Sequence, residues 1–141
     1  MQLIEEMMIL ANVAAAETLE KAAVPTMYRV HDRPSEEKIT RFNDFLKSLG
    51  FQKRLPEVSG TAFNDILNRV AGKKLGYALN TFVLRTQAQA QYSPENIGHF
   101  GLALARYAHF TSPIRRYADL MVHRALVRAF KLGRGGLTAD E

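Results

Sequence analysis

The segment 111–116, TSPIRR, is the sequence feature that most restricts how this chain can fold, because it predicts where a helix begins. Ser112 can accept a hydrogen bond from the first free amides of a helix, and Pro113 suits the first helical position because it lacks an N–H. The same turn would carry Arg115 and Arg116, which the positive end of the helix dipole disfavours. Free amides and guanidinium groups at one place favour a bound phosphate or carboxylate. The segment therefore predicts an anion site at a helix start.

The composition is that of a globular protein with an affinity for anions. The 141 residues suffice for one domain or a large fragment of one, and 47% of them are hydrophobic and 23% charged. The N-terminus is acidic ahead of its apolar part, unlike a secretory signal. The chain has no cysteine, which excludes disulfides and thiolate chemistry and fits a cytoplasmic location. A net charge of +5 favours polyanionic partners such as nucleic acid.

The hydrophobic pattern predicts an α+β fold that is mostly helical, with about five helices and a few short strands. Helices are expected over 3–23, from the cap Ser35 to Gly50, over 61–71, over 75–90, and from Ser112 onward. A short strand is expected at 27–31, and β-like runs at 99–104 and 107–111 are expected to pair or to bend around one another. A loop is expected over 51–60, a turn over 92–96, and a frayed tail over 132–141.

The spacing of apolar residues predicts which faces of the last and first helices are buried. The last helix is expected to bury Ile114, Tyr117, Met121 and Ala125. In the first helix, Glu5 and Asn12 are seven residues apart and share an otherwise apolar face. Taken alone, this pattern favours both polar side chains at the edge of the face, where they reach solvent or a neighbouring backbone.

The residues that could carry chemistry do not form a complete hydrolytic centre. The four histidines are scattered, so we predict no zinc site, and no tight cluster of aspartates exists that could hold two magnesium ions. Ser112 has no visible base partner, so capping is its expected role.

The region 106–124 combines cations with aromatic rings, as single-stranded nucleic acid sites do. From spacing alone, an amphipathic helix with a solvated basic face explains it equally well. Asp119 could pair with Arg115 or Arg116, which would either weaken the anion site or orient one arginine while the other faces the ligand.

Several motifs together resemble the RNB catalytic domain of the ribonuclease II and ribonuclease R family. The main match is HFGLAL at 99–104 followed by YAHFTSPIRRY at 107–117, with Asp119 and His123 beyond it. The resemblance covers nearly the whole chain. LIEEMM at 3–8 with Ala11 and Asn12, RVHDRPS at 29–35 and YSPEN at 92–96 resemble the ribonuclease R branch in particular.

The resemblance implies that residues 1–131 are the C-terminal part of an RNB domain. The parent would be a processive 3′-to-5′ exoribonuclease that hydrolyses single-stranded RNA to nucleoside 5′-monophosphates. Its magnesium would be held by aspartates upstream of the matched segment, so this chain would bind no metal and would be inactive alone. Its partner would be the 3′ end of single-stranded RNA.

The resemblance also assigns residues to the site. Arg115 matches the arginine that contacts the scissile phosphate and stabilises the charge developing there. Arg116 would be a second phosphate contact or a structural partner of Asp119. Glu5, rather than Glu6, matches a glutamate at the RNA-binding end of the channel, since it shares a face with Asn12. Four further residues would line the channel near the RNA 3′ end: Tyr107, His109, Thr111 and Ser112.

Two other hypotheses stay open at this point. The chain could be a stand-alone RNA-binding or interaction module, or a helical domain with no role in nucleic-acid binding. For a fragment of a domain we also expect exposed apolar surface or self-association along the first helix.

Overall fold

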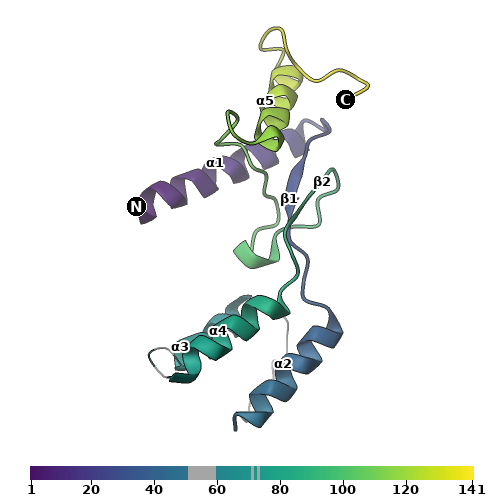
Figure 1. Cartoon of the computed structure of the whole chain (residues 1–141). Coiled ribbons are helices and arrows are strands. Elements are labelled where there is room, and N and C mark those ends of the chain that lie inside the picture. The colour runs from purple at the N-terminus through teal and green to yellow at the C-terminus, as the bar shows by residue number, and fades with distance from the viewer. Residues whose placement is uncertain (51–59, 71, 73) are drawn as a thin grey trace. The chain divides into compact units, whose positions relative to one another are not determined.

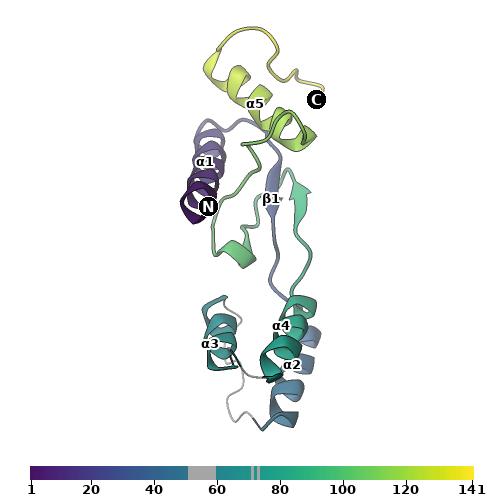
Figure 2. The same cartoon turned by 60° about the vertical axis from the view of Figure 1, so that its left-hand side comes forward.

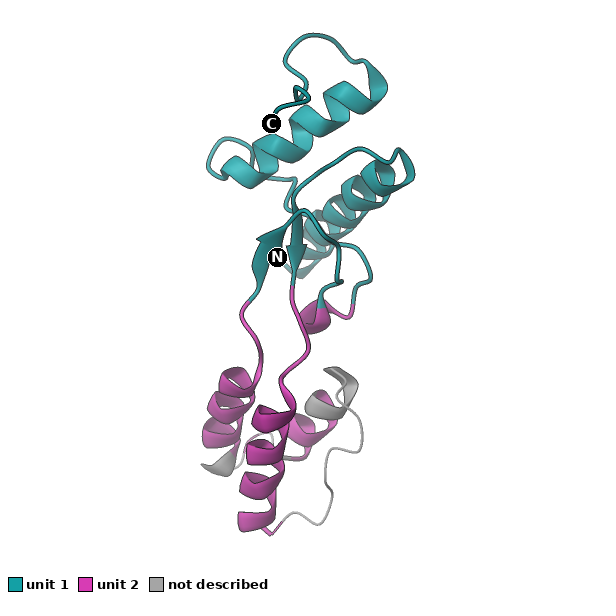
Figure 3. Ribbon diagram, turned by 90° about the vertical axis from the view of Figure 1, so that its right-hand side faces the viewer, with its two compact units in different colours: residues 1–30, 90–99, 104–141 teal, residues 31–89, 100–103 magenta. Residues whose placement is uncertain are grey.

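The computed structural model describes residues 1–50, 60–70, 72 and 74–141. These residues form two compact units (Figure 3), one of residues 1–30, 90–99 and 104–141, and a second of residues 31–89 and 100–103. The described residues contain five α-helices and two short strands, which confirms the predicted α+β class. None of the described helices is both long and apolar enough to cross a bilayer. Most of the loop expected over 51–60 lies outside the described residues.

The first unit is built from two helices and a two-stranded sheet (Figure 1). Its elements are α1 (Gln2–Lys21), β1 (Tyr28–Val30), β2 (Gln91–Ser93) and α5 (Tyr117–Phe130). The strands are antiparallel and pair Arg29 with Tyr92. β1 confirms the strand expected at 27–31, whereas most of β2 lies where a turn was expected, over 92–96. The core lies between α1, β1 and α5, and its buried apolar residues are Ala15, Ala16, Leu19, Tyr28, Val30, Ala108, Val122 and Ala125.

The N-terminal half of α1 is apolar and exposed. Alanine, leucine, methionine and glutamate favour this long helix, but its burial begins only at Asn12. Leu3, Ile4 and Leu10 are each more than 60% exposed. The expected apolar stripe is therefore buried only in its second half. The exposed apolar surface that we expected along this helix is present, while self-association through it stays a prediction.

In the second unit three helices lie together (Figure 2): α2 (Glu36–Ser48), α3 (Gly60–Val70) and α4 (Lys74–Thr86). The unit also contains the 3₁₀ turn η1 (Phe100–Leu102). Ser35 Oγ accepts a hydrogen bond from the Lys38 amide at 3.4 Å, which confirms the predicted cap. The core contains Phe42, Leu46, Ile66, Leu79 and Val83. α4 ends at Thr86 and not at residue 90, since the following residues turn away and His31 Nε2 lies 2.7 Å from the Ala88 carbonyl oxygen.

The two expected β-like runs do not pair with each other. His99 and Leu104 form an isolated antiparallel bridge, so the first run folds back on itself. The second run forms no strand, although the Tyr107 carbonyl accepts a hydrogen bond from the Arg29 amide at 2.9 Å. The first run therefore pairs within itself and the second bonds to β1, so pairing between the runs, one of the two expected alternatives, is wrong. The runs do meet through the rings of His99 and Tyr107, whose centroids are 5.3 Å apart.

The predicted start of the last helix is also wrong. Residues 113–115 form a separate turn, in which the Ser112 carbonyl accepts hydrogen bonds from the amides of Arg115 and Arg116. Arg116 is extended, with φ −123° and ψ 117°, and α5 begins only after it. This break rotates the segment, so Ile114 is 99% and Tyr117 70% exposed, contrary to the expected buried face. Ala125 is buried as expected.

The tail 132–141 has no helix or strand but returns along α5. Arg124 binds both carboxylate oxygens of Glu141, at 2.7 Å each, and the Leu137 amide donates to the Arg124 carbonyl oxygen at 3.2 Å. These contacts oppose the fraying that we expected for this segment.

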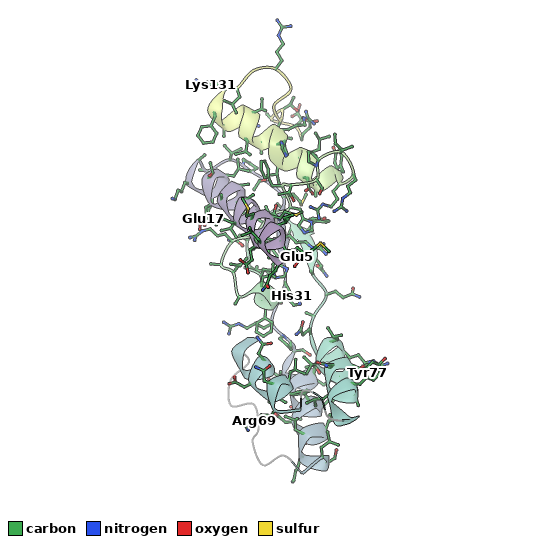
Figure 4. All side chains as sticks on the ribbon, turned by 90° about the vertical axis from the view of Figure 1, so that its left-hand side faces the viewer. Glu5, Glu17, His31, Arg69, Tyr77 and Lys131 are labelled. Atoms are coloured by element: carbon green, nitrogen blue, oxygen red, sulfur yellow. The ribbon has the colours of Figure 1, made fainter. Side chains whose placement is uncertain are left out.

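The helical cluster of the second unit should depend on Phe42, which is fully buried. We expect Phe42→Ala to lower the free energy of unfolding by about 3–5 kcal/mol, because it leaves a cavity in the core. Urea unfolding followed by circular dichroism measures this. The control is Tyr77→Ala on α4, where the side chain is 84% exposed (Figure 4) and the expected change is within about 0.5 kcal/mol. Equal effects of the two substitutions would contradict this core assignment.

Candidate functional site

The segment that was predicted to bind an anion forms a turn and not a helix start. We call residues 111–116 the arginine turn. It precedes α5, and the Asp119 carboxylate holds it from the first turn of that helix. Asp119 Oδ2 accepts a hydrogen bond from the Ser112 amide at 2.8 Å and one from the Arg116 guanidinium at 2.9 Å. Asp119 is completely buried. Because the Ser112 N–H donates to Asp119, this N–H is not available to a ligand.

The two arginines of the turn have different environments. The Arg116 guanidinium pairs with Asp119 and its side chain is 23% exposed. This is the structural alternative that the sequence offered for Arg116. Arg115 is exposed and, within the described part of the chain, its side chain forms no hydrogen bond or ion pair. Arg115 is therefore the cation of the turn that remains available to an anion.

The backbone just before the arginine turn is fixed by two helices. Asn12 of α1 is 4% exposed, and its Oδ1 accepts a hydrogen bond from the Phe110 amide at 2.9 Å. Its Nδ2 donates to the Tyr107 hydroxyl at 3.0 Å. From α5, His123 Nε2 lies 2.8 Å from the Phe110 carbonyl oxygen. Asn12 is thus buried and not at the edge of its face, although it does reach a neighbouring backbone as expected. Its amide links α1 to the segment 107–110.

His109 lies among cations yet stays neutral. Its Nδ1 is 2.8 Å from the Tyr92 hydroxyl, and its ring contacts those of Tyr92 and Tyr107 edge to face. Burial lowers the pKa of His109 from 6.5 to about 4, with the positive charges of Arg116, Arg29 and Arg115 acting in the same direction. Three arginine side chains thus place positive charge around this ring, which would favour an anion nearby.

The structure brings together most of the residues that the sequence predicted, but not all. Tyr107, His109, Thr111, Ser112, Arg115 and Arg116 lie on one segment next to α5. Thr111 Oγ1 is buried and has no hydrogen-bond partner within the described residues. Glu5 is exposed on α1 (Figure 4), seven residues before Asn12, which is about 10 Å along a helix.

Sequence reasoning missed Tyr92 and Arg29. The Arg29 guanidinium lies over the Tyr92 ring, 4.6 Å from its centroid, because the two residues are directly paired across β1 and β2. Both residues lie in motifs quoted above, RVHDRPS and YSPEN, and the alternating pattern at 27–31 predicted the first strand. Nothing local identified its partner strand.

The described residues do not fit a metal ion. Among them there is no group of three or more histidine or carboxylate side chains that could hold one. We therefore derive no chemical step through magnesium from this chain.

Because His109 is neutral in the folded chain, the free energy of unfolding should depend on pH. Between about pH 6.5 and 4 the unfolded chain binds a proton at His109 that the folded chain does not, so stability should fall as the pH drops through this range. NMR titration of the ring should give a pKa near 4, and His109→Gln should reduce the pH dependence of urea unfolding. A His109 pKa of 6.5 or above would contradict this assignment.

Comparisons with known proteins agree with the motifs quoted above. A model of the RNB domain matches residues 1–131. Ribonuclease R of Vibrio parahaemolyticus is 50% identical over 126 residues, which cover 89% of this chain and 15% of the relative. Ribonuclease R of Escherichia coli K12 is 52% identical over 144 residues, which cover 99% of this chain and 18% of the relative. The chain thus spans less than a fifth of the length of these relatives.

Solved structures show the same fold. Mycoplasma genitalium RNase R in complex with double-stranded RNA superposes with a TM-score of 0.84 at 33% identity, over 97% of this chain and 25% of that one. The same enzyme in complex with ribose-methylated single-stranded RNA superposes with a TM-score of 0.79 at 35% identity. This match covers 88% of this chain and 20% of that one. Yeast Ssd1, a pseudonuclease, superposes with a TM-score of 0.79 over 97% of this chain and 18% of that one. At 23% identity this likeness shows a shared fold and nothing more. Since the family model matches most of its residues, the chain belongs to the RNB domain family.

Proposed function

We propose that this chain is the C-terminal part of the catalytic domain of a 3′-to-5′ exoribonuclease of the ribonuclease R type. The proposal is supported by the RNB match and by relatives that are ribonuclease R at about half identity. The observation that carries it is the exposed Arg115 on a turn held by buried Asp119, inside the matched region. The substrate is the 3′ end of single-stranded RNA and the products are nucleoside 5′-monophosphates.

Arg115 is the catalytic residue that this chain supplies. Its guanidinium binds the scissile phosphate and stabilises the negative charge that grows on the phosphate oxygens as water attacks. A planar guanidinium can hold two of these oxygens at once. Arg116, paired with Asp119, keeps the local potential positive but is not itself free to follow the phosphate.

The other predicted residues shape the end of the RNA channel. His109 is neutral, so it offers a ring for stacking and a hydrogen bond, and not a charge. Tyr107 is 8% exposed and supports the His109 ring, and the Ser112 hydroxyl faces the RNA. The Thr111 hydroxyl oxygen is buried, so Thr111 lines the channel without presenting that oxygen to the RNA. Glu5 on α1 contacts RNA farther along the channel, and Glu6 is the alternative for this role. Magnesium in the parent enzyme is bound by residues outside this chain, and the location is cytoplasmic.

A chimera tests the proposed function. In ribonuclease R of Escherichia coli, the segment that matches this chain is replaced by it, and labelled single-stranded RNA is digested with magnesium present. We expect stepwise release of nucleoside 5′-monophosphates from the 3′ end by the chimera, and none from the 141-residue chain alone. A folded but inactive chimera, together with RNA binding by the chain alone, would favour the stand-alone binding module instead. Robust digestion by the chain alone would overturn the claim that it is catalytically incomplete.

The same chimera tests Arg115. We expect Arg115→Ala to lower kcat about 100-fold or more, since it removes a donor aimed at charge that develops in the transition state. The matched control is Arg134→Ala, which removes an exposed positive charge from the tail and should leave the rate within about twofold. Equal effects of the two substitutions would show that Arg115 contributes only general positive charge.

A further inference from the structure

Among the described residues, the hydrogen bonds of the buried Asp119 carboxylate go only to the arginine turn. Both of its hydrogen bonds, to the Ser112 amide and to the Arg116 guanidinium, are made by Oδ2. Its other oxygen, Oδ1, is buried and has no partner within the described residues. A buried carboxylate is costly unless a cation or several donors compensate it. The residues that compensate Asp119 are those on either side of Arg115.

Arg115 is fixed through its neighbours and not through its own side chain. Its amide bonds the Ser112 carbonyl at 3.3 Å, and the Arg116 amide bonds the same oxygen at 3.0 Å. Asp119 holds the Ser112 amide on one side of Arg115 and the Arg116 side chain on the other. The Arg115 backbone is therefore held at the Ser112 carbonyl, while its exposed guanidinium forms no hydrogen bond or ion pair among the described residues.

The contacts farther upstream do not replace this anchor. Asn12 and His123 bind the backbone of Phe110, two residues before Ser112. They set where the segment enters the arginine turn but, among the described residues, form no hydrogen bond with residues 111–116. The direction in which the turn presents Arg115 is thus decided by Asp119.

We propose that Asp119 is a positioning residue that aims Arg115 at the scissile phosphate and keeps Arg116 from competing for it. This role rests on the proposed function of Arg115. In the first turn of α5 the Asp119 charge is also favoured by the helix dipole, so the helix itself stabilises the anchor. Asp119 acts through Arg115 and does not contact the RNA.

The test is a double-variant cycle in the active chimera. Asp119→Asn keeps the shape of the side chain but removes the charge that binds Arg116. We expect kcat to fall about 10- to 100-fold, the range in which a small misplacement of a catalytic group lowers a rate, with KM for RNA changed less than threefold. We expect Asp119→Asn combined with Arg115→Ala to be no slower than Arg115→Ala alone, because both substitutions remove the same phosphate contact.

The outcomes separate this inference from the proposed function. If Arg115→Ala leaves the rate unchanged, the proposed phosphate contact fails and the role of Asp119 with it. If Arg115→Ala slows the enzyme but Asp119→Asn does not, or if the two losses multiply in the double variant, only the positioning role is overturned.

A second variant keeps the test decisive if Asp119→Asn does not fold, as judged by circular dichroism. Arg116→Gln breaks the ion pair but leaves the bond from the Ser112 amide. We expect a smaller loss of kcat that again disappears in the Arg115→Ala background. A loss that multiplies with that of Arg115→Ala would mean that Arg116 binds phosphate independently, which contradicts the inference.

Discussion

The hydrogen bonds of the buried Asp119 carboxylate determine the geometry of the candidate site. A charge that is completely removed from water must be compensated locally, and here the Ser112 amide and the Arg116 guanidinium do so. This requirement turns what could be the first turn of α5 into a separate arginine turn. It also places one of the two adjacent arginines, Arg116, in an ion pair. The other, Arg115, is left exposed at a positively charged surface.

A second buried polar side chain, Asn12, joins this turn to the rest of its unit. Its amide donates to the Tyr107 hydroxyl and accepts from the Phe110 backbone, so it links α1 to the segment before the arginine turn. Glu5 lies on the same helix, seven residues earlier. The two residues proposed to contact RNA at different points, Glu5 and Arg115, are thus connected through one buried amide.

The sequence predicted what depends on local patterns. The capped helix α2 was found because Ser35 and the apolar spacing after it are local signals, and the confirmed family match followed from ordered motifs. The start of α5 was missed because Ser112 and Pro113 suit a helix start locally, while Asp119, seven residues later, takes the Ser112 amide. β2 and the neutral state of His109 were missed because both depend on residues far away in sequence, such as Arg29.

The fold alone does not decide whether this site catalyses, since a pseudonuclease shares it. The central claim is that Arg115, and not Arg116, binds the scissile phosphate. It is tested most directly by a crystal structure of the chimera with ribose-methylated single-stranded RNA. The account predicts the Arg115 guanidinium within hydrogen-bond distance of the phosphate nearest the 3′ end, with Arg116 still on Asp119. Arg116 on the phosphate, or Arg115 directed away from the RNA, would contradict it.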